Sequence, residues 1–179
     1  MYKSNIDETQ TMVKLNFAIL AVSDTRTLET DDSGALLKSM ISESGHVVLD
    51  RDIVTDDQDM IRQKVNNWIA NDDIDVVITT GGTGFSQRDV TPEALMPLFD
   101  KVMDGFSVLF HQYSAAQIGT STIQSRATGG LAGQTLIFCL PGSRGACRDG
   151  WQGVINYQLD SRHKPCNFLE VLPKYSGRE

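Results

Sequence analysis

Cysteine is scarce in this chain of 179 residues, which contains Cys139, Cys147 and Cys166. Their number is odd and no C-x-x-C motif occurs, so the sequence predicts neither a disulfide framework nor a zinc site. Free thiols are typical of a reducing compartment, and we therefore expect a cytoplasmic protein.

Long apolar runs and blocks of like charge are also missing. No apolar stretch approaches the ~20 residues that a membrane-spanning helix needs, and the polar segment 1–11 lacks the apolar centre of a signal peptide. The net charge of −7 is spread along the sequence, which argues against nucleic acid or an anionic membrane as a partner. Length and composition are those of one globular domain.

Several common catalytic and nucleotide-binding motifs are absent. The sequence contains no G-x-x-x-x-G-K-[ST] loop, no G-x-G-x-x-G fingerprint and no G-x-S-x-G elbow. It therefore supports neither P-loop hydrolysis, dinucleotide binding nor the chemistry of a serine hydrolase. The histidines lie far apart and show no metal-binding spacing.

Apolar, strand-like segments alternate with segments of helical spacing along the chain. The predicted strands are 15–22, 46–54, 74–80 and 135–140. This alternation predicts an α/β protein with a mainly parallel sheet that helices cover on both faces. No repeat or linker divides the chain, and residues 1–13 are expected to form a flexible arm.

A glycine-rich loop follows the third predicted strand. The three glycines of residues 81–84 (GGTG) can take positive φ angles and expose backbone N–H groups. Thr91-Pro92 then predicts a helix start, with Thr91 as the N-cap. Such a nest suits an anion, although a tight turn also requires glycine. Arg88 and Asp89 favour the first interpretation, because they supply a phosphate fork and a magnesium ligand.

Polar residues after the other strands are expected at the same edge of the sheet. Asp56 follows the second strand, where Thr55 and Gln58 form a capping-box pattern that would make Asp56 a first-turn acid. The carboxyl ends of parallel strands meet at one edge, so Asp56 and Asp89 could instead share one divalent ion. Other residues of this edge are either ligand contacts or ordinary turn residues: Ser23, Asp24, Pro141, Gly142 and Ser143. Ser125 and Arg126 are either a ligand contact or the exposed end of a helix.

Together these motifs resemble a known family. The segment 79–85, followed by Arg88-Asp89-Val90-Thr91-Pro92-Glu93, is similar to the signature of the MoaB/MogA family of molybdenum cofactor biosynthesis proteins, which includes the G domains of gephyrin and plant Cnx proteins. Further matches are Ser23-Asp24, Asp32-Ser33-Gly34, Ser125-Arg126 and Leu140-Pro141-Gly142-Ser143. The segment 162–168 resembles the MoaB branch. We therefore expect one MoaB/MogA-like domain over residues 14–168 and a C-terminal tail over 169–179.

The resemblance implies a three-layer α/β/α fold, a homotrimer or homohexamer, and a reaction. Active members of the family adenylylate molybdopterin with Mg-ATP and release pyrophosphate. On this resemblance, Asp56 and Asp89 are catalytic and hold Mg²⁺ on the ATP phosphates. The residues expected to bind substrate or nucleotide are Ser23, Asp24, Gly81, Gly82, Thr83, Gly84, Arg88, Thr91, Ser125, Pro141, Gly142 and Ser143.

Two other functions remain open. A non-catalytic protein could bind or carry molybdopterin in the same pocket, and an oligomeric scaffold could act through its assembly alone. The expected partners are molybdopterin, ATP and further copies of the chain, and other enzymes of the pathway are candidates. Two acidic residues that converge on a glycine loop favour the enzyme over the scaffold, whereas the sequence does not separate enzyme from carrier.

Overall fold

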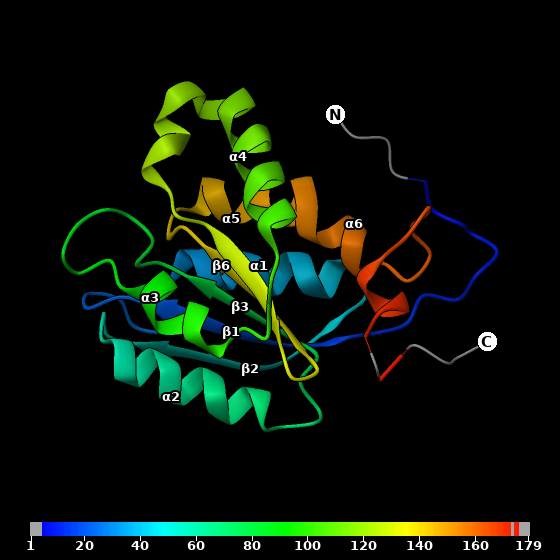
Figure 1. Ribbon diagram of the computed structural model, residues 1–179, viewed down its shortest axis with the longest axis horizontal. Helices are drawn as coiled ribbons and strands as arrows, with labels where there is room; N and C mark the ends of the chain where they lie inside the picture. The colour runs from blue at the N-terminus through cyan, green and yellow to red at the C-terminus, as the bar shows by residue number, and fades with distance from the viewer. Residues whose placement is uncertain (1–4, 173, 176–179) are drawn as a thin grey trace.

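A mixed sheet forms the centre of the structure, a computed structural model that describes residues 5–172, 174 and 175 (Figure 1). Its strands are β1 (Asn16–Val22), β2 (Val47–Val54), β3 (Val76–Thr80), β4 (Lys101–Val102), β5 (Thr128–Ala132) and β6 (Thr135–Leu140). They lie in the order β2-β1-β3-β6-β5-β4. The first four of this order run parallel, and β5 and β4 add an antiparallel edge. The prediction of a mainly parallel sheet is confirmed.

Helices cover both faces of the sheet. They are α1 (Asp32–Glu43), α2 (Gln58–Ile69), α3 (Thr91–Leu95), α4 (Asp104–Ile118), α5 (Arg144–Gly150) and α6 (Asn156–Leu159). Shorter segments are η1 (Met96–Leu98), η2 (Gly119–Gln124) and η4 (Phe168–Glu170), and η3 (Trp151–Ile155) is π-helical. Helices α2 and α3 pack on one face of the sheet and α1, α4, α5 and α6 on the other, which confirms the three-layer arrangement. In Figure 1, α2 lies below the sheet and α4 and α5 above it. No helix of the described residues has the length and apolar character of a membrane span.

Alternate residues of the central strands pack into opposite layers, as the pleat of a strand requires. In β1, Phe17 and Ile19 belong to the core cluster on the α1 side, whereas Ala18 and Leu20 belong to the cluster on the α2 side. Because both faces of these strands are buried, their sequences are continuously apolar. This burial explains why the parallel strands are predictable from sequence.

Strand β5 is missing from the predicted elements because its two adjacent glycines are typical of a break. In the structure, a Cβ atom on Gly130 would lie 2.3 Å from the Phe99 ring, and one on Gly129 would lie 2.9 Å from the Ile137 carbonyl oxygen. These glycines therefore permit close packing inside the sheet, as glycine in a strand often does.

Two predicted helix starts are wrong in detail. Helix α2 begins at Gln58, and its N-cap is Asp57, whose carboxylate accepts two backbone N–H bonds of the first turn, so Thr55 is not the cap. Thr91 does not cap α3, because its hydroxyl donates to the Gly81 carbonyl oxygen at 2.8 Å. Asp57 therefore caps α2 in place of Thr55, and the Thr91 hydroxyl bonds to the glycine loop instead of capping α3.

The described ends of the chain pack onto the domain. Ile6, in the predicted arm, forms an antiparallel bridge with His163. Leu169 and Leu172, in the predicted tail, are buried. The boundaries at 14 and 168 stay predictions, and the arm and tail also include residues outside the described part (1–4, 173 and 176–179).

Candidate functional site

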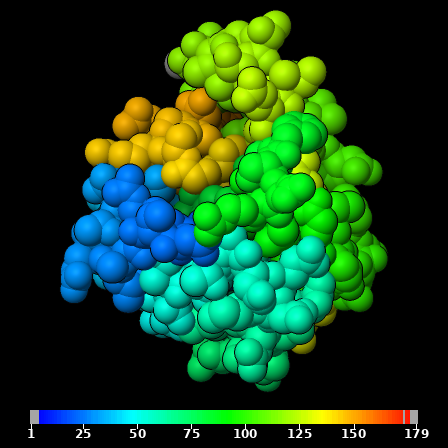
Figure 2. All heavy atoms as spheres, turned by 90° about the vertical axis from the view of Figure 1, so that its left-hand side faces the viewer, coloured from blue at the N-terminus to red at the C-terminus, as the bar shows by residue number. Residues whose placement is uncertain are grey.

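The carboxyl ends of β2, β1, β3 and β6 meet at one edge of the sheet, on the left in Figure 1. Figure 2 faces this edge and shows a hollow between α5, η2 and the loop that precedes α3. Two pockets of about 310 Å³ and 430 Å³ lie here. Gly142 and Ser143 line both of them, so the loop after β6 stands between two adjoining pockets.

The larger pocket, here called the glycine-loop pocket, contains most of the predicted site residues. Gly81 and Gly82 have φ angles of 108° and 63°, a backbone region that favours glycine, and the Gly81 N–H donates to the Leu140 carbonyl oxygen at 3.0 Å. The predicted residues that line this pocket are Gly81, Gly82, Thr83, Gly84, Asp89, Ser125, Pro141, Gly142 and Ser143. The other wall comes from α4 and η2.

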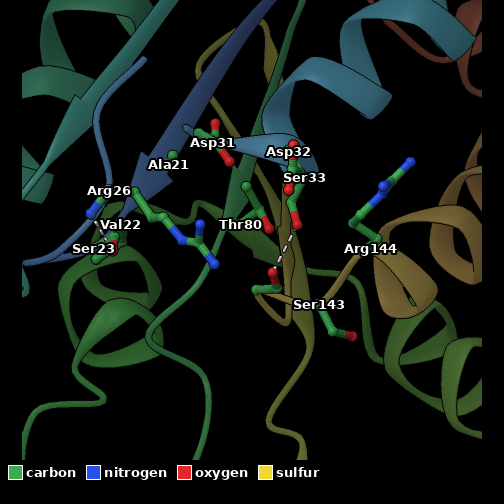
Figure 3. A pocket seen from close by; sticks show the side chains of 11 residues that line it. Ala21, Val22, Ser23, Arg26, Asp31, Asp32, Ser33, Thr80, Ser143 and Arg144 are labelled. Carbon is green, nitrogen blue, oxygen red and sulfur yellow. Dashed lines mark hydrogen bonds between the residues drawn. The ribbon is translucent and has the colours of Figure 1, made fainter. Parts of the chain in front are cut away.

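The smaller pocket, here called the arginine pocket, lies between the loop after β1 and the start of α5. Arg26 and Arg144 extend from opposite sides, with Ser33 and Thr80 between them (Figure 3). The Ser33 hydroxyl donates to the Gly142 carbonyl oxygen at 2.8 Å, which joins α1 to the shared loop. Asp31 and Asp32 also line this pocket, so its lining combines two guanidinium groups, which can bind an anion, with two carboxylates.

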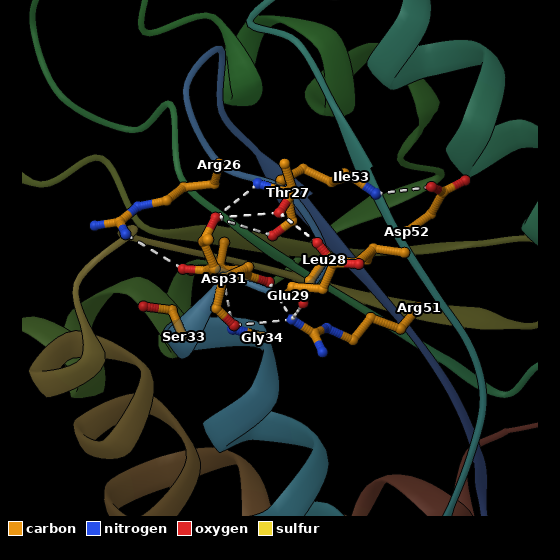
Figure 4. A network of polar contacts seen from close by, with 12 residues as sticks. Arg26, Thr27, Leu28, Glu29, Asp31, Ser33, Gly34, Arg51, Asp52 and Ile53 are labelled. Atoms are coloured by element: carbon orange, nitrogen blue, oxygen red, sulfur yellow. Dashed lines mark hydrogen bonds and ion pairs between the residues drawn. The ribbon is translucent and has the colours of Figure 1, made fainter.

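A buried ion pair fixes the loop that carries Arg26. Arg51 Nη2 donates to Asp31 Oδ2 at 2.9 Å, to the Asp31 carbonyl oxygen at 2.8 Å and to the Leu28 carbonyl oxygen at 3.1 Å (Figure 4). The two side chains are 17% and 6% exposed. Removal of one partner would leave a buried charge unpaired, which is strongly destabilising. The loop is therefore held firmly beside the arginine pocket.

The two predicted catalytic carboxylates flank the glycine loop. A Cβ atom on Gly82 would lie 3.3 Å from Asp56 Oδ1, and one on Gly84 would lie 2.9 Å from Asp89 Oδ2. Burial raises the pKa of Asp56, and the charge of Asp89 raises it further. Burial also acts to raise the pKa of Asp89, but hydrogen bonds from Ser86 and Gly84 outweigh it and lower that pKa. Asp89 is thus the more acidic member of the pair.

Four predicted site residues line neither pocket: Asp24, Asp56, Arg88 and Thr91. Asp24 Oδ1 accepts a hydrogen bond from the Asp56 backbone N–H at 3.1 Å, and its carboxylate pairs with Arg88. Thr91 is fully buried beneath the glycine loop. Asp24, Arg88 and Thr91 support Asp56 and the loop in this structure, whereas the sequence predicted that they would contact ligand.

The donor set fits a magnesium ion that arrives with phosphate ligands. Among the residues described, no group of three or more His, Cys, Asp or Glu side chains could hold a metal. Mg²⁺ is commonly bound by one or two carboxylates together with water and substrate phosphates. Asp56 and Asp89 supply these carboxylates, and a cation between them would relieve the repulsion that raises the pKa of Asp56.

Asp56→Asn is expected to raise the melting temperature at pH 7 by about 1–2 °C. The raised pKa of Asp56 means that its ionised form destabilises the fold. This penalty grows as the pH rises through the raised pKa, and it vanishes well below the ordinary value of 3.8. Thermal scans at pH 7 and pH 3 measure the difference. Asp59→Asn is the control, because Asp59 is 92% exposed; a lower melting temperature for Asp56→Asn at pH 7 would contradict the assignment.

Comparison with known proteins identifies the family. A sequence profile described as "Probable molybdopterin binding domain" matches residues 18–161. Molybdenum cofactor biosynthesis protein B of Escherichia coli (strain K12) is 49% identical over 162 residues, which cover 90% of this chain and 95% of that protein. The chain belongs to the MoaB/MogA family.

Solved structures of the MoaB/MogA family share the fold. A crystal structure of Molybdenum cofactor biosynthesis protein B matches with a TM-score of 0.81 and 44% identity, covering 84% of this chain and 94% of that one. A MogA structure matches with a TM-score of 0.72 and 30% identity, covering 80% and 97%. The higher identities to protein B confirm the MoaB branch of this family of molybdenum cofactor biosynthesis proteins.

Sequence reasoning missed several residues that support this MoaB/MogA site. Ser33 lies inside a motif that carries the family resemblance, so its position in that motif was its signal; Arg126 was predicted as either a ligand contact or an exposed helix end. Arg26 and Arg51 gave no signal in the sequence, because their role depends on contacts between segments that are distant in the sequence. Arg51, for example, contacts Leu28, 23 residues away.

Proposed function

We propose that this protein binds molybdopterin and ATP at the carboxyl edge of its sheet and adenylylates molybdopterin with release of pyrophosphate. The observation that supports this most directly is that the arginine pocket and the glycine-loop pocket adjoin at Gly142 and Ser143. Two reactants bound in adjoining pockets would meet at that loop. Proximity of this kind removes much of the entropic barrier to a reaction of two molecules.

The proposed reaction joins two anions. The terminal phosphate of molybdopterin attacks the α-phosphorus of ATP, a new P–O bond forms, and the bond to pyrophosphate breaks. The protein's task is to position the reactants and neutralise their charge. The Gly81 and Gly84 amides are already bonded to Leu140 and Asp89, so the Gly82 and Thr83 amides and the guanidinium groups of Arg26 and Arg144 are the groups proposed for this task. Mg²⁺, which Asp56 and Asp89 would hold, supplies further charge neutralisation on the ATP phosphates.

Self-association is part of the proposal. Apolar side chains are exposed on α4 and η2, which extend away from the sheet in Figure 1. They are Val108 (55%), Leu109 (36%), Ile118 (54%) and Ile123 (75%). Exposed apolar groups that lie on one projecting element are typical of an interface between proteins, and we propose that further copies of the chain cover them in a homotrimer or homohexamer.

Incubation with Mg-ATP and molybdopterin is expected to give adenylylated molybdopterin and pyrophosphate in equal amounts. A MogA protein serves as the positive control, and omission of Mg²⁺ as the negative control. In parallel, each ligand alone should raise the melting temperature, because a ligand at 100 times its Kd adds about 2.7 kcal/mol to stability.

These two measurements separate the alternatives. Stabilisation by molybdopterin without product, under conditions in which MogA turns over, would replace the enzyme by a carrier. Stabilisation by neither ligand would favour the oligomeric scaffold.

A further inference from the structure

We propose that Arg126 is a positioning residue that fixes the loop between β3 and α3 and so places the Asp89 carboxylate at the glycine-loop pocket. Its effect on the loop is independent of the reaction. Its effect on the rate rests on the proposed function.

The guanidinium group of Arg126 joins the two ends of this loop. Its Nε donates to the Gly84 carbonyl oxygen at 2.8 Å, and its Nη2 donates to the Asp89 carbonyl oxygen at 2.6 Å. The backbone N–H of Arg126 donates to the Thr83 carbonyl oxygen at 3.0 Å. One residue therefore holds both the entry and the exit of residues 84–89.

The guanidinium charge of Arg126 is paired with groups of the protein itself. Its Nη1 pairs with the Glu93 carboxylate of α3, and the Phe85 ring lies with its centroid 5.7 Å from Cζ. Burial acts to raise the pKa of Glu93, but the hydrogen bond from Arg126 outweighs it, so the pKa is lowered. Arg126 lines neither pocket. It therefore acts on the site through the loop.

The conformation of this loop determines where the Asp89 carboxylate lies. Asp89 Oδ2 accepts hydrogen bonds from the Ser86 N–H at 2.9 Å and from the Ser86 hydroxyl at 2.6 Å. Residues 85–88 are exposed, so burial contributes little to holding them. Hydrogen bonds therefore hold the backbone of this loop, and Arg126 donates them to both of its ends.

The direction of β5 brings Arg126 to this edge of the sheet. Strand β5 runs antiparallel to β6 and pairs its first residue, Thr128, with Cys139 near the end of β6. The chain therefore enters β5 at the carboxyl edge, two residues after Arg126. A parallel strand in the same place would begin at the opposite edge.

Hydrogen exchange tests the effect on the loop directly. In Arg126→Gln the amides of Ser86 and Asp89 are expected to exchange about 10-fold faster or more, because the loop loses several hydrogen bonds. Arg126→Lys should show the same increase, since it keeps the charge but not the planar fork. Trypsin should also cleave after Arg88 faster in both variants.

A matched arginine provides the control. Arg162 forms a similar fork, with Nε and Nη2 at 2.9 Å and 2.8 Å from the carboxylate oxygens of Asp160. Arg162→Gln should leave the exchange of Ser86 and Asp89 unchanged. Unchanged exchange of these amides in folded Arg126→Gln would overturn the proposal; if that variant does not fold, the same result in Arg126→Lys would do so.

Kinetics test the effect on the rate. Arg126→Gln is expected to lower kcat about 100-fold, as a misplacement of ~1 Å can, while the KM for ATP changes by less than about 3-fold. Guanidinium ion added to Arg126→Ala should restore part of kcat, which general destabilisation would not allow. Wild-type kcat in Arg126→Gln, despite faster exchange, would overturn the positioning role. An inactive wild type would instead refute the adenylylation, and the exchange result would still decide whether Arg126 holds the loop.

Discussion

Asp89→Asn is expected to lower the rate of adenylylation about 10³-fold while the fold is retained. The asparagine oxygen can still accept the two hydrogen bonds from Ser86, so these contacts within the loop are retained, while the hydrogen bond from Gly84 loses its charged acceptor. The negative charge, however, is lost from the wall of the glycine-loop pocket, and with it a ligand for Mg²⁺. Steady-state kinetics across a series of Mg²⁺ concentrations measure the change.

The control for this variant is Asp59→Asn. Asp59 is an exposed carboxylate of α2 that pairs with Arg62, so its substitution removes the same charge away from the pockets. Circular dichroism and the melting temperature check that each variant folds. A full rate in Asp89→Asn would show that the metal-ligand assignment is wrong.

Gly81→Ala is expected to destabilise the protein by about 3 kcal/mol or more. Gly81 has a φ of +108°, and a Cβ atom there would lie 2.3 Å from the Val22 carbonyl oxygen. The obstruction is backbone of the adjacent strand, which cannot rotate away. For a domain of this size the loss corresponds to a fall of roughly 6–12 °C in melting temperature.

Gly133→Ala separates the two causes of this loss. Gly133 also has a positive φ, +59°, but a Cβ atom there would lie no closer than 3.9 Å to its neighbours outside the adjoining residues. Its substitution should cost about 1 kcal/mol, from backbone strain alone. Equal losses for the two alanine variants, measured by denaturant unfolding, would show that the contact with Val22 is unimportant.

The parallel part of the fold was predictable because its signals are local. Strands buried on both faces need continuous apolar runs, and β1, β3 and β6 contain them. The antiparallel edge was not predictable, because β4 has only two residues, Lys101 and Val102, and β5 contains glycines that suit a strand only where Phe99 and Ile137 pack closely against it.

The site was predictable to the extent that its chemistry lies in short motifs. Residues 81–84 and Pro141-Gly142-Ser143 line one pocket, because loops after parallel strands lie at one edge of the sheet; their contact with ligand stays a prediction. Two contacts were not predictable: the ion pair between Arg88 and Asp24, and the hydrogen bonds from Arg126 to the loop between β3 and α3. Both depend on residues more than 30 positions apart in the chain, as in the contact between Arg126 and Glu93.

The position of β3 between β1 and β6 has a consequence during protein synthesis. The Gly81 backbone N–H donates to the carbonyl oxygen of Leu140. The Thr80 hydroxyl donates to the carbonyl oxygen of Pro141, which lies 61 residues further along the chain. A nascent chain that ends before β6 therefore has three parallel strands, with the apolar edge of β3 open to mispairing. The ability to bind ligand should emerge late, once the ribosome has released most of the domain.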